Sequence, residues 1–197
     1  MDKGRLEAFS DGVIAIIITI MVLELKVPHS EDGHPSLGDL VKLWPVFLSY
    51  ALSFVYLGIY WNNHHHMLHA VHRVSGGMLW ANLHLLFWLS LVPFVTGWMG
   101  ENHFAAWPCA VYGIVMLAAA IAYYILQQVI IASQGSGSVL KKAVGSDWKG
   151  KVSPAMYALA IAVAFVAPSM SLALYVLVAL IWLVPDRRIE HVLAQKQ

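Results

Sequence analysis

Apolar residues fall into long runs along this chain, and short polar segments separate them. A helix needs roughly 20 residues to cross a hydrocarbon core about 30 Å thick. Four runs reach about that length, and in order they cover Leu6 to Lys26, Leu43 to Asn63, Met78 to Met99 and Ala106 to Ala132. The pattern therefore predicts an all-α integral membrane protein.

A fifth apolar stretch, Val152 to Pro185, is too long for a single crossing. As one helix its 34 residues would extend about 51 Å. The segment Ala167-Pro168-Ser169 near its middle is a turn signal. We therefore expect two short helices that form a tight hairpin. This gives six transmembrane helices in one domain that covers residues 1–197.

The positive charges indicate how these helices are oriented. With six crossings both termini lie on one side, and ten of the twelve Lys and Arg residues fall on that side. Lys26 and Lys42 remain on the other side. Because Lys and Arg concentrate in cytoplasmic loops, we expect both termini to be cytoplasmic and the chain to be a multi-pass protein of a cell membrane.

The composition narrows the function classes further. Hydrophobic residues make up 59% of the chain and charged residues 12%, whereas a soluble domain has about 25% charged residues. The sequence shows no nucleophile–base pair, phosphate loop or nucleic-acid surface, so we expect neither an enzyme nor a nucleic-acid partner. Cys109 is the single cysteine, which excludes an intrachain disulfide.

The first apolar run carries charge into the membrane region from both ends. The uncharged stretch from Gly12 to Leu23 has twelve residues, which is roughly 18 Å of helix. Asp11 and Glu24 flank it and would press into the bilayer. A charge near a helix centre costs at least about 2.5 kcal/mol and is usually paired and functional. This favours a helix that is surrounded by protein or that lines water.

The same helix separates an aliphatic face from a polar one. At about 100° per residue, one stripe collects Arg5, Phe9, Gly12, Ile16, Ile20 and Leu23, with Thr19 beside it. Asp11 points about 140° away from Ile16, and Ser10 lies on the same far side. We expect the polar face to contact the rest of the same subunit. The stripe by itself also fits ordinary helix packing.

Asp11 needs a partner at its depth in the membrane. The candidates are Arg5, Lys3 and the cluster that ends the second apolar run, Trp61-Asn62-Asn63-His64-His65-His66. A His or Trp from this cluster could donate a charge-assisted hydrogen bond to the aspartate. An alternative function follows, in which Asp11 and the histidines serve a proton-permeable channel or a proton-coupled transporter.

The histidines also allow a different class of protein. His65 and His69 have the i, i+4 spacing that suits zinc, and His64, His66 and His72 lie nearby. No Cys, Asp or Glu close in sequence completes such a site. A membrane metal or haem protein that uses this cluster together with His84 is therefore kept as an alternative, although we expect no bound metal.

Several of these residues together resemble a known family. Arg5-x-x-x-Phe9-Ser10-Asp11 at the start of the first helix is similar to the signature of the transmembrane protein 175 family, the lysosomal potassium channels and their bacterial relatives. Later features agree with it, namely Trp61-x-x-His64-His65, Asn82-Leu83 with Phe87, and Pro93-Phe94. One six-helix unit resembles the bacterial type, in which four subunits surround a pore lined by their first helices.

The resemblance implies a function for each matching position. Ile16 would form the hydrophobic constriction, and Ile20 and Leu23 would form further layers of the pore. Thr19 would contribute to the preference for potassium. The motif residues would hold helices together; they are Arg5, Phe9, Ser10, Asp11, Trp61, His64, His65 and Asn82. The chain lacks the Thr-Val-Gly-Tyr-Gly filter of ordinary potassium channels, so carbonyl-based selectivity is not expected.

The prediction is therefore a homotetrameric, potassium-permeable cation channel in a lipid bilayer, with potassium as its permeant ion and no cofactor. Glu24 lies about 80° from Ile16 at the outer end of the first helix. Four copies could edge an outer vestibule and attract cations. An interfacial carboxylate paired with Lys26 would explain the same residue.

Overall fold

The computed structural model describes residues 2–29, 34, 36–71, 73–135, 138, 140–141 and 147–183, and the regular structure within these ranges is entirely helical. In chain order the elements are α1 Lys3–Ile20, η1 Met21–Glu24 (a 3₁₀ turn), α2 Leu37–Lys42, α3 Trp44–His69, α4 Gly76–Ser90, α5 Val92–Glu101, α6 Ala106–Gln134, α8 Trp148–Ala164 and α9 Pro168–Leu183.

Four helical segments are long and apolar enough to cross a membrane. They are Lys3–Glu24, Trp44–His69, Gly76–Glu101 and Ala106–Gln134. The predicted all-helical membrane architecture is confirmed at this level. The four segments match the four long apolar runs of the sequence, with ends that differ by a few residues.

Two of the apolar runs differ from the continuous helices expected for them, and proline explains both. The third run breaks at Leu91 into α4 and α5, because Pro93 has no N–H for the carbonyl of Leu89 and its ring crowds that turn. In the first run, α1 tightens into η1 and ends at Glu24 rather than near Lys26. There, Pro28 cannot donate a helical hydrogen bond to the Glu24 carbonyl.

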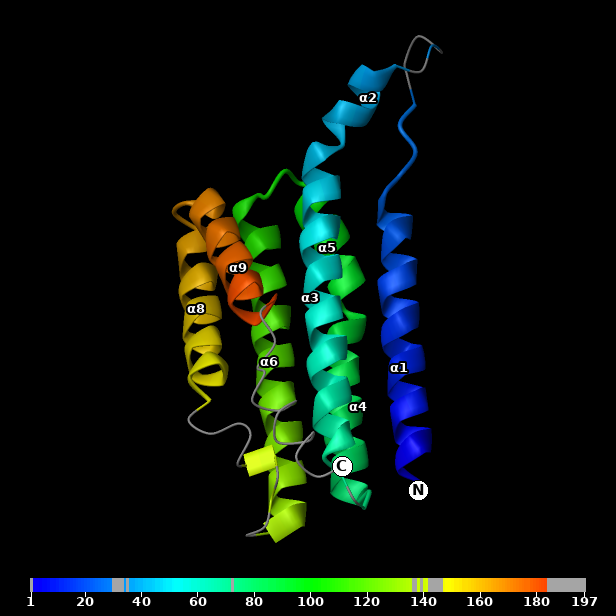
Figure 1. Ribbon diagram of the computed structural model, residues 1–197. Helices are drawn as coiled ribbons and strands as arrows, with labels where there is room; N and C mark the ends of the chain where they lie inside the picture. The colour runs from blue at the N-terminus through cyan, green and yellow to red at the C-terminus, as the bar shows by residue number, and fades with distance from the viewer. Residues whose placement is uncertain are drawn as a thin grey trace.

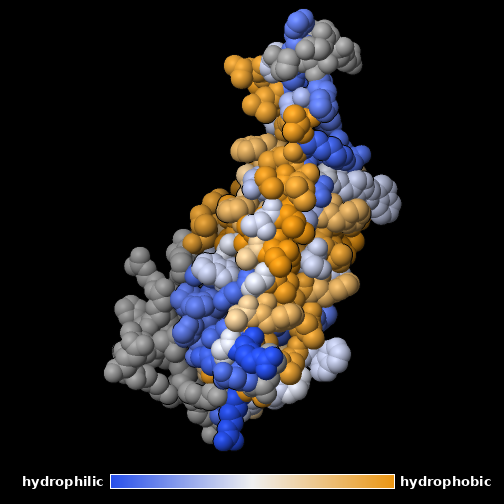
Figure 2. Space-filling view, turned by 90° about the vertical axis from the view of Figure 1, so that its right-hand side faces the viewer, coloured by the Kyte–Doolittle hydropathy of each residue, from blue (hydrophilic) through white to orange (hydrophobic). Residues whose placement is uncertain are grey.

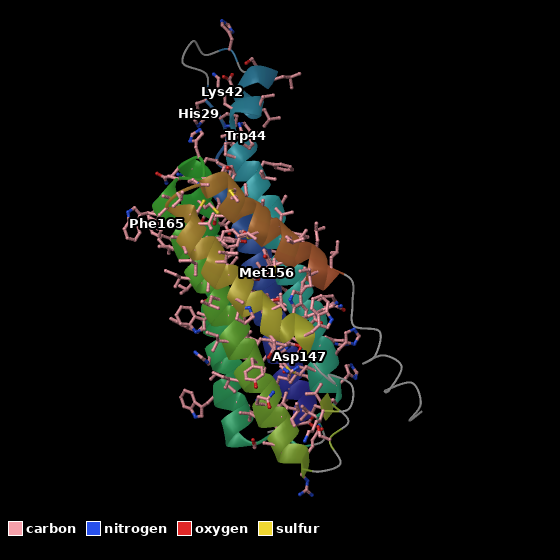
Figure 3. The ribbon with its side chains drawn as sticks, turned by 90° about the vertical axis from the view of Figure 1, so that its left-hand side faces the viewer. His29, Lys42, Trp44, Asp147, Met156 and Phe165 are labelled. Atoms are coloured by element: carbon pink, nitrogen blue, oxygen red, sulfur yellow. The ribbon has the colours of Figure 1, made fainter. Side chains whose placement is uncertain are left out.

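The fifth apolar stretch forms the expected hairpin. α8 ends at Ala164 and α9 begins at Pro168, so the turn falls where the sequence signal lies. The two helices pack side by side, as Figure 3 shows from their side of the molecule. Their 17 and 16 residues give about 25 Å of helix each, which is shorter than a typical span.

The short helix α2, Leu37–Lys42, precedes α3 and was not among the predicted helices. Its first turn has a capping arrangement in which the Asp39 carboxylate accepts hydrogen bonds from the backbone N–H and the hydroxyl of Ser36, at 3.1 and 2.9 Å. The Ser-x-x-Asp spacing that signals such a cap is present in the sequence.

The helices form an elongated bundle with α1 at one edge and the α8–α9 hairpin at the other (Figure 1). α1 packs against α3, α4 and α5, whereas α6 lies in the middle and packs against α4, α5 and α8. One continuous apolar core joins these helices. Among the described residues, the layout leaves one long side of α1 without a neighbour.

Hydroxyl groups tie the central helices together. Thr96 of α5 donates to Ser53 of α3 at 2.6 Å, and the Ser53 oxygen lies 3.1 Å from the Tyr112 hydroxyl of α6. The Tyr175 hydroxyl of α9 donates to the Cys109 carbonyl at 2.9 Å. Such interhelical bonds are how polar groups are satisfied at membrane depth.

Candidate functional site

The two faces of α1 differ sharply in exposure within the subunit. On one face Ile16 and Ile20 are 60% and 45% exposed, and Leu23 of the following turn η1 is 74% exposed. On the other face Ser10 and Ile14 are fully buried. Figure 2 shows the side of the molecule that carries α1, with apolar side chains along its middle and hydrophilic ones toward both ends. The structure thus places the motif residue Ser10 on the face opposite the stripe, whereas the motif residues Arg5 and Phe9 are exposed.

Ser10 belongs to a buried chain of hydrogen bonds across three helices. The Asn82 amide of α4 donates to the Ser10 hydroxyl at 2.9 Å, and Ser10 donates to the Leu6 carbonyl at 2.8 Å. The other end of the amide, Asn82 Oδ1, lies 2.7 Å from Nε2 of His64 on α3. An amide oxygen can only accept, so His64 Nε2 carries the proton. The chain joins α1, α4 and α3 at one level.

His64 is only partly satisfied by this chain. Its side chain is 1% exposed, and its Nδ1 has no hydrogen-bond partner among the described residues. With the proton on Nε2, the bare Nδ1 is a buried acceptor with an open lone pair. The hydrogen bond to Asn82 therefore places a proton on Nε2 and leaves Nδ1 facing no partner among the described residues.

Asp11 takes a different partner from the nearby histidines. Trp61 Nε1 donates to Asp11 Oδ1 at 3.1 Å. Of the other candidates, Lys3 instead donates to the His69 carbonyl at 3.0 Å and lies 3.8 Å from Glu7, while Arg5 is exposed. The Trp61 indole, rather than an imidazole or a cation, is thus the group that donates a hydrogen bond to Asp11. Phe9, next to the motif serine, is 50% exposed.

The remaining histidines pack against one another as rings. His65 lies 4.4 Å from His69 and 6.2 Å from Trp61, measured between ring centroids. Within the described residues no group of three or more His, Cys, Asp or Glu is placed to hold a metal ion. His72 falls outside the described residues. His84 is elsewhere on α4, where its Nε2 accepts from Trp88 Nε1 at 2.9 Å, so it does not extend the cluster.

Thr19 is exposed on the same side as Ile16 and Ile20. Its hydroxyl donates back into the helix, with the carbonyls of Ala15 and Ile16 at 2.9 and 3.0 Å. The proton is therefore occupied, while the oxygen keeps lone pairs for another group. A side chain fixed in this way can act as an oxygen ligand.

Glu24 contacts a residue that the sequence analysis did not identify. Its carboxylate lies directly over Gly97 of α5, at a spot that a Cβ on that residue would overlap. Gly97 thus makes room for Glu24, and no local sequence signal links the two. Lys26 pairs with Glu101 instead of with Glu24. This hydrogen bond and the charge of Glu101 raise the pKa of Lys26 above its usual value.

Comparison with known proteins places these features in context. Residues 5–93 match the family model for the endosomal/lysosomal potassium channel TMEM175. A protein of Chryseobacterium sp. named as a potassium channel is 56% identical over 99% of this chain and 100% of its own length. A bovine endosomal/lysosomal proton channel TMEM175 is 36% identical over 40% of this chain and 18% of its own length.

A solved structure is similar over nearly the whole chain. The crystal structure of a lysosomal potassium-selective channel TMEM175 homolog from Chamaesiphon minutus superposes with a TM-score of 0.81 at 30% identity. The match covers 93% of this chain and 97% of that one. The helical arrangement described above is therefore shared with an experimentally determined channel structure.

Proposed function

This chain is a member of the TMEM175 family of channels, and we propose on that premise that it is a potassium-permeable cation channel of a cell membrane. Its family is one of channels and not of enzymes. The observation that carries the proposal is the aliphatic face of α1, which is exposed in the subunit although α1 is one of the membrane-crossing segments. The similar bacterial proteins are named as potassium channels, which supports potassium as the permeant ion.

The proposed assembly is a homotetramer with its pore on the central axis. Four copies would bring their α1 helices together and cover the side of α1 that no described helix of the same subunit covers. Each subunit would contribute six transmembrane helices in one domain, residues 1–197, with α8 and α9 as the last two. The distribution of Lys and Arg supports cytoplasmic termini.

Ile16 is proposed as the constriction of this pore, with Ile20 and Leu23 as further layers. A ring of aliphatic side chains closes a narrow path by steric contact and by dewetting. Since the chain has no carbonyl filter sequence, selectivity falls to side chains, and Thr19 offers the oxygen on this face. Glu24 is proposed to edge the outer vestibule, where four carboxylates would concentrate cations.

The motif residues are proposed to hold the pore helix in place rather than to line the path. Ser10 and Asp11 point into the subunit, and their bonds to Asn82 and Trp61 attach α1 to α4 and α3. His65 packs against Trp61. Arg5 and Phe9 flank this level on the exposed side, where a neighbouring subunit would meet them.

Potassium flux into liposomes tests the proposal. Ile16→Asn should wet the constriction and raise flux by about tenfold or more, since each ~1.4 kcal/mol removed from a barrier gives a factor of ten. Ile121→Asn provides a matched control, because Ile121 is also an exposed isoleucine but belongs to α6. Unchanged flux in Ile16→Asn protein that assembles normally would show that Ile16 is not the constriction.

A second candidate function is proton permeation. It rests on the open lone pair at His64 Nδ1 and on the printed name of the bovine relative as a proton channel. A pH-sensitive dye inside the same liposomes distinguishes the two ions. Proton flux that persists when potassium and sodium are replaced by an impermeant cation would favour this second function.

A further inference from the structure

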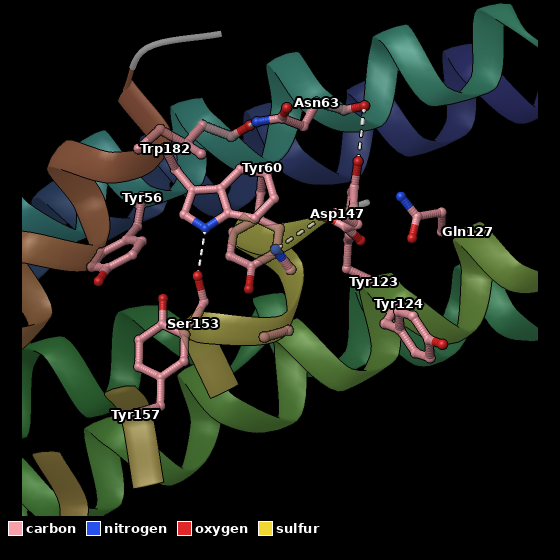
Figure 4. A pocket seen from close by; sticks show the side chains of 13 residues that line it. Tyr56, Tyr60, Asn63, Tyr123, Tyr124, Gln127, Asp147, Ser153, Tyr157 and Trp182 are labelled. Carbon is pink, nitrogen blue, oxygen red and sulfur yellow. Dashed lines mark hydrogen bonds between the residues drawn. The ribbon is translucent and has the colours of Figure 1, made fainter. Parts of the chain in front are cut away.

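A cavity lies within the subunit away from α1, between α3, α6, α8 and α9. The empty space between its walls is about 560 Å³ when its open mouth is included. Residues of all four helices line it, whereas none comes from α1. Figure 4 shows it from close by. It is therefore separate from the proposed pore.

Aromatic rings form most of the wall. Tyr60 and Tyr123 meet edge to face with their centroids 6.2 Å apart, and Trp182 lies across from them (Figure 4). Their polar atoms are partly occupied already, since Trp182 Nε1 donates to Ser153 at 2.7 Å and the Tyr123 hydroxyl donates to the Asn63 carbonyl at 3.3 Å. The ring faces remain available for a flat or cationic group.

Gln127 of α6 is a polar group of this cavity. Its side chain is 6% exposed and lines the wall, and its amide makes no hydrogen bond within the part of the chain that the structure describes. Asn63, which also lines the cavity, instead donates to the Ile59 carbonyl at 2.8 Å. The free amide of Gln127 therefore offers both a donor and an acceptor to a ligand.

Asp147 adds negative charge at the start of α8. One of its oxygens accepts from the Gly150 N–H at 3.0 Å and so fixes the carboxylate toward the cavity. A cation–π contact is already present here, because Lys149 Nζ lies 5.9 Å from the Trp182 ring centroid. Aromatic faces and a carboxylate together are the chemistry that recognises an ammonium group.

An adjoining groove opens the way from the membrane. Phe54, Val55 and Gly58 of α3 line it together with Leu183, and it shares Ile59 and Trp182 with the cavity. Phe54, Val55 and Leu183 are exposed. An apolar molecule dissolved in the bilayer can therefore reach the aromatic wall along α3.

We propose that this cavity binds a small organic cation, a protonated amine with an apolar body of about the size of one aromatic ring. The ammonium group donates to the Asp147 carboxylate and to the Gln127 amide oxygen, and the apolar body packs between the tyrosines and Trp182. The inference is independent of the proposed pore, because neither the site nor its occupancy requires ion conduction.

Binding of 2-phenylethylamine to the purified full chain in detergent micelles tests this, with 2-phenylethanol as the uncharged comparison. We expect saturable binding of the amine at neutral pH, at least tenfold tighter than binding of the alcohol. Gln127→Leu should weaken amine binding tenfold or more. Gln128→Leu should leave it unchanged, since Gln128 is the exposed neighbour on the same helix.

Asp147→Asn is the second variant, because it keeps an oxygen for the Gly150 N–H and removes only the charge. It should reduce amine binding and leave alcohol binding as it was. Equal affinity of the wild-type protein for amine and alcohol would overturn the proposal without any variant. So would unchanged amine binding in a folded Gln127→Leu or Asp147→Asn protein.

Discussion

The two faces of α1 are both largely apolar, but they differ in what they contact. The buried face combines Leu6, Ile14 and Ile17 with the polar Ser10, whereas Ile16 on the other face is 60% exposed. In a soluble protein an exposed face would carry mainly polar groups. Here the polar group is satisfied inside the subunit, and the exposed aliphatic face is left for lipid or for other copies of the chain.

The difference shows how one helix can combine attachment with a separate surface for function. Buried polar groups are costly unless they are bonded, so the Ser10–Asn82–His64 chain fixes the position of α1 at one level. Aliphatic side chains impose no directional bonds, so Ile16 and Ile20 can meet a symmetry-related helix or a water-filled path. Substitutions on the buried face should therefore affect stability and assembly, whereas substitutions on the exposed face should affect ion conduction.

The largest effect is expected from removing the central amide of the buried face. Asn82→Leu leaves Ser10 and His64 Nε2 without their shared partner, at about 1–3 kcal/mol per stranded group. We expect a loss of roughly 2–3 kcal/mol in stability, measured as a lower thermal midpoint by circular dichroism in detergent.

Asn62→Leu provides the matched control for this change. Asn62 belongs to α3 and is partly exposed, so the same substitution there should move the midpoint much less. If both variants unfold at the same temperature, the buried hydrogen-bond chain is not what secures α1.

A smaller effect is expected from Asp11→Ala on the same face. The change removes the acceptor for Trp61 Nε1, but Trp61 is 45% exposed within the subunit, so the freed donor can find water. We expect a loss of about 1 kcal/mol together with partial loss of the assembled oligomer on size exclusion. A stable oligomer with altered ion selectivity would instead place Asp11 in the ion path.

The helical pattern of the sequence predicted the faces of α1 because that information is local. Residues at i, i+3 and i+4 share a side whatever the rest of the fold does, so Ser10 and Ile16 could be assigned to different faces in advance. The hairpin turn before Pro168 was predictable for the same reason. The break at Leu91 also has a sequence signal, which is Pro93. The length of the apolar run nevertheless favoured one continuous helix.

The partners within the site could not be predicted in the same way. Sequence placed Asp11 and the histidines at one depth, but the choice of Trp61 for Asp11 and of Asn82 for His64 depends on how α1, α3 and α4 are rotated against each other. Gly97 and Gln127 had no local signal at all, because what matters at each is a side chain or a cavity contributed by other helices.

The outer end of the exposed face gives a third test. If four Glu24 carboxylates edge a vestibule, Glu24→Gln should lower potassium conductance about twofold in low salt, which corresponds to roughly 0.4 kcal/mol. The difference should disappear in molar salt, where the screening length falls to about 3 Å. Single-channel recordings at both ionic strengths measure it. A reduction that persists in high salt would point to a structural function against Gly97 instead.

The smallest expected effect concerns Thr19, the hydroxyl of the exposed face. Its proton is held by the helix carbonyls, so only its oxygen can face an ion, and a ring of four would give a partly dehydrated cation weak ligands. Potassium releases its water more readily than sodium, so such a ring favours potassium modestly.

Thr19→Val keeps the shape and removes the oxygen. We expect the potassium-to-sodium permeability ratio from reversal potentials to fall by less than about twofold, under roughly 0.4 kcal/mol, with assembly unchanged. An unchanged ratio would assign the preference to the width of the ring at Ile16.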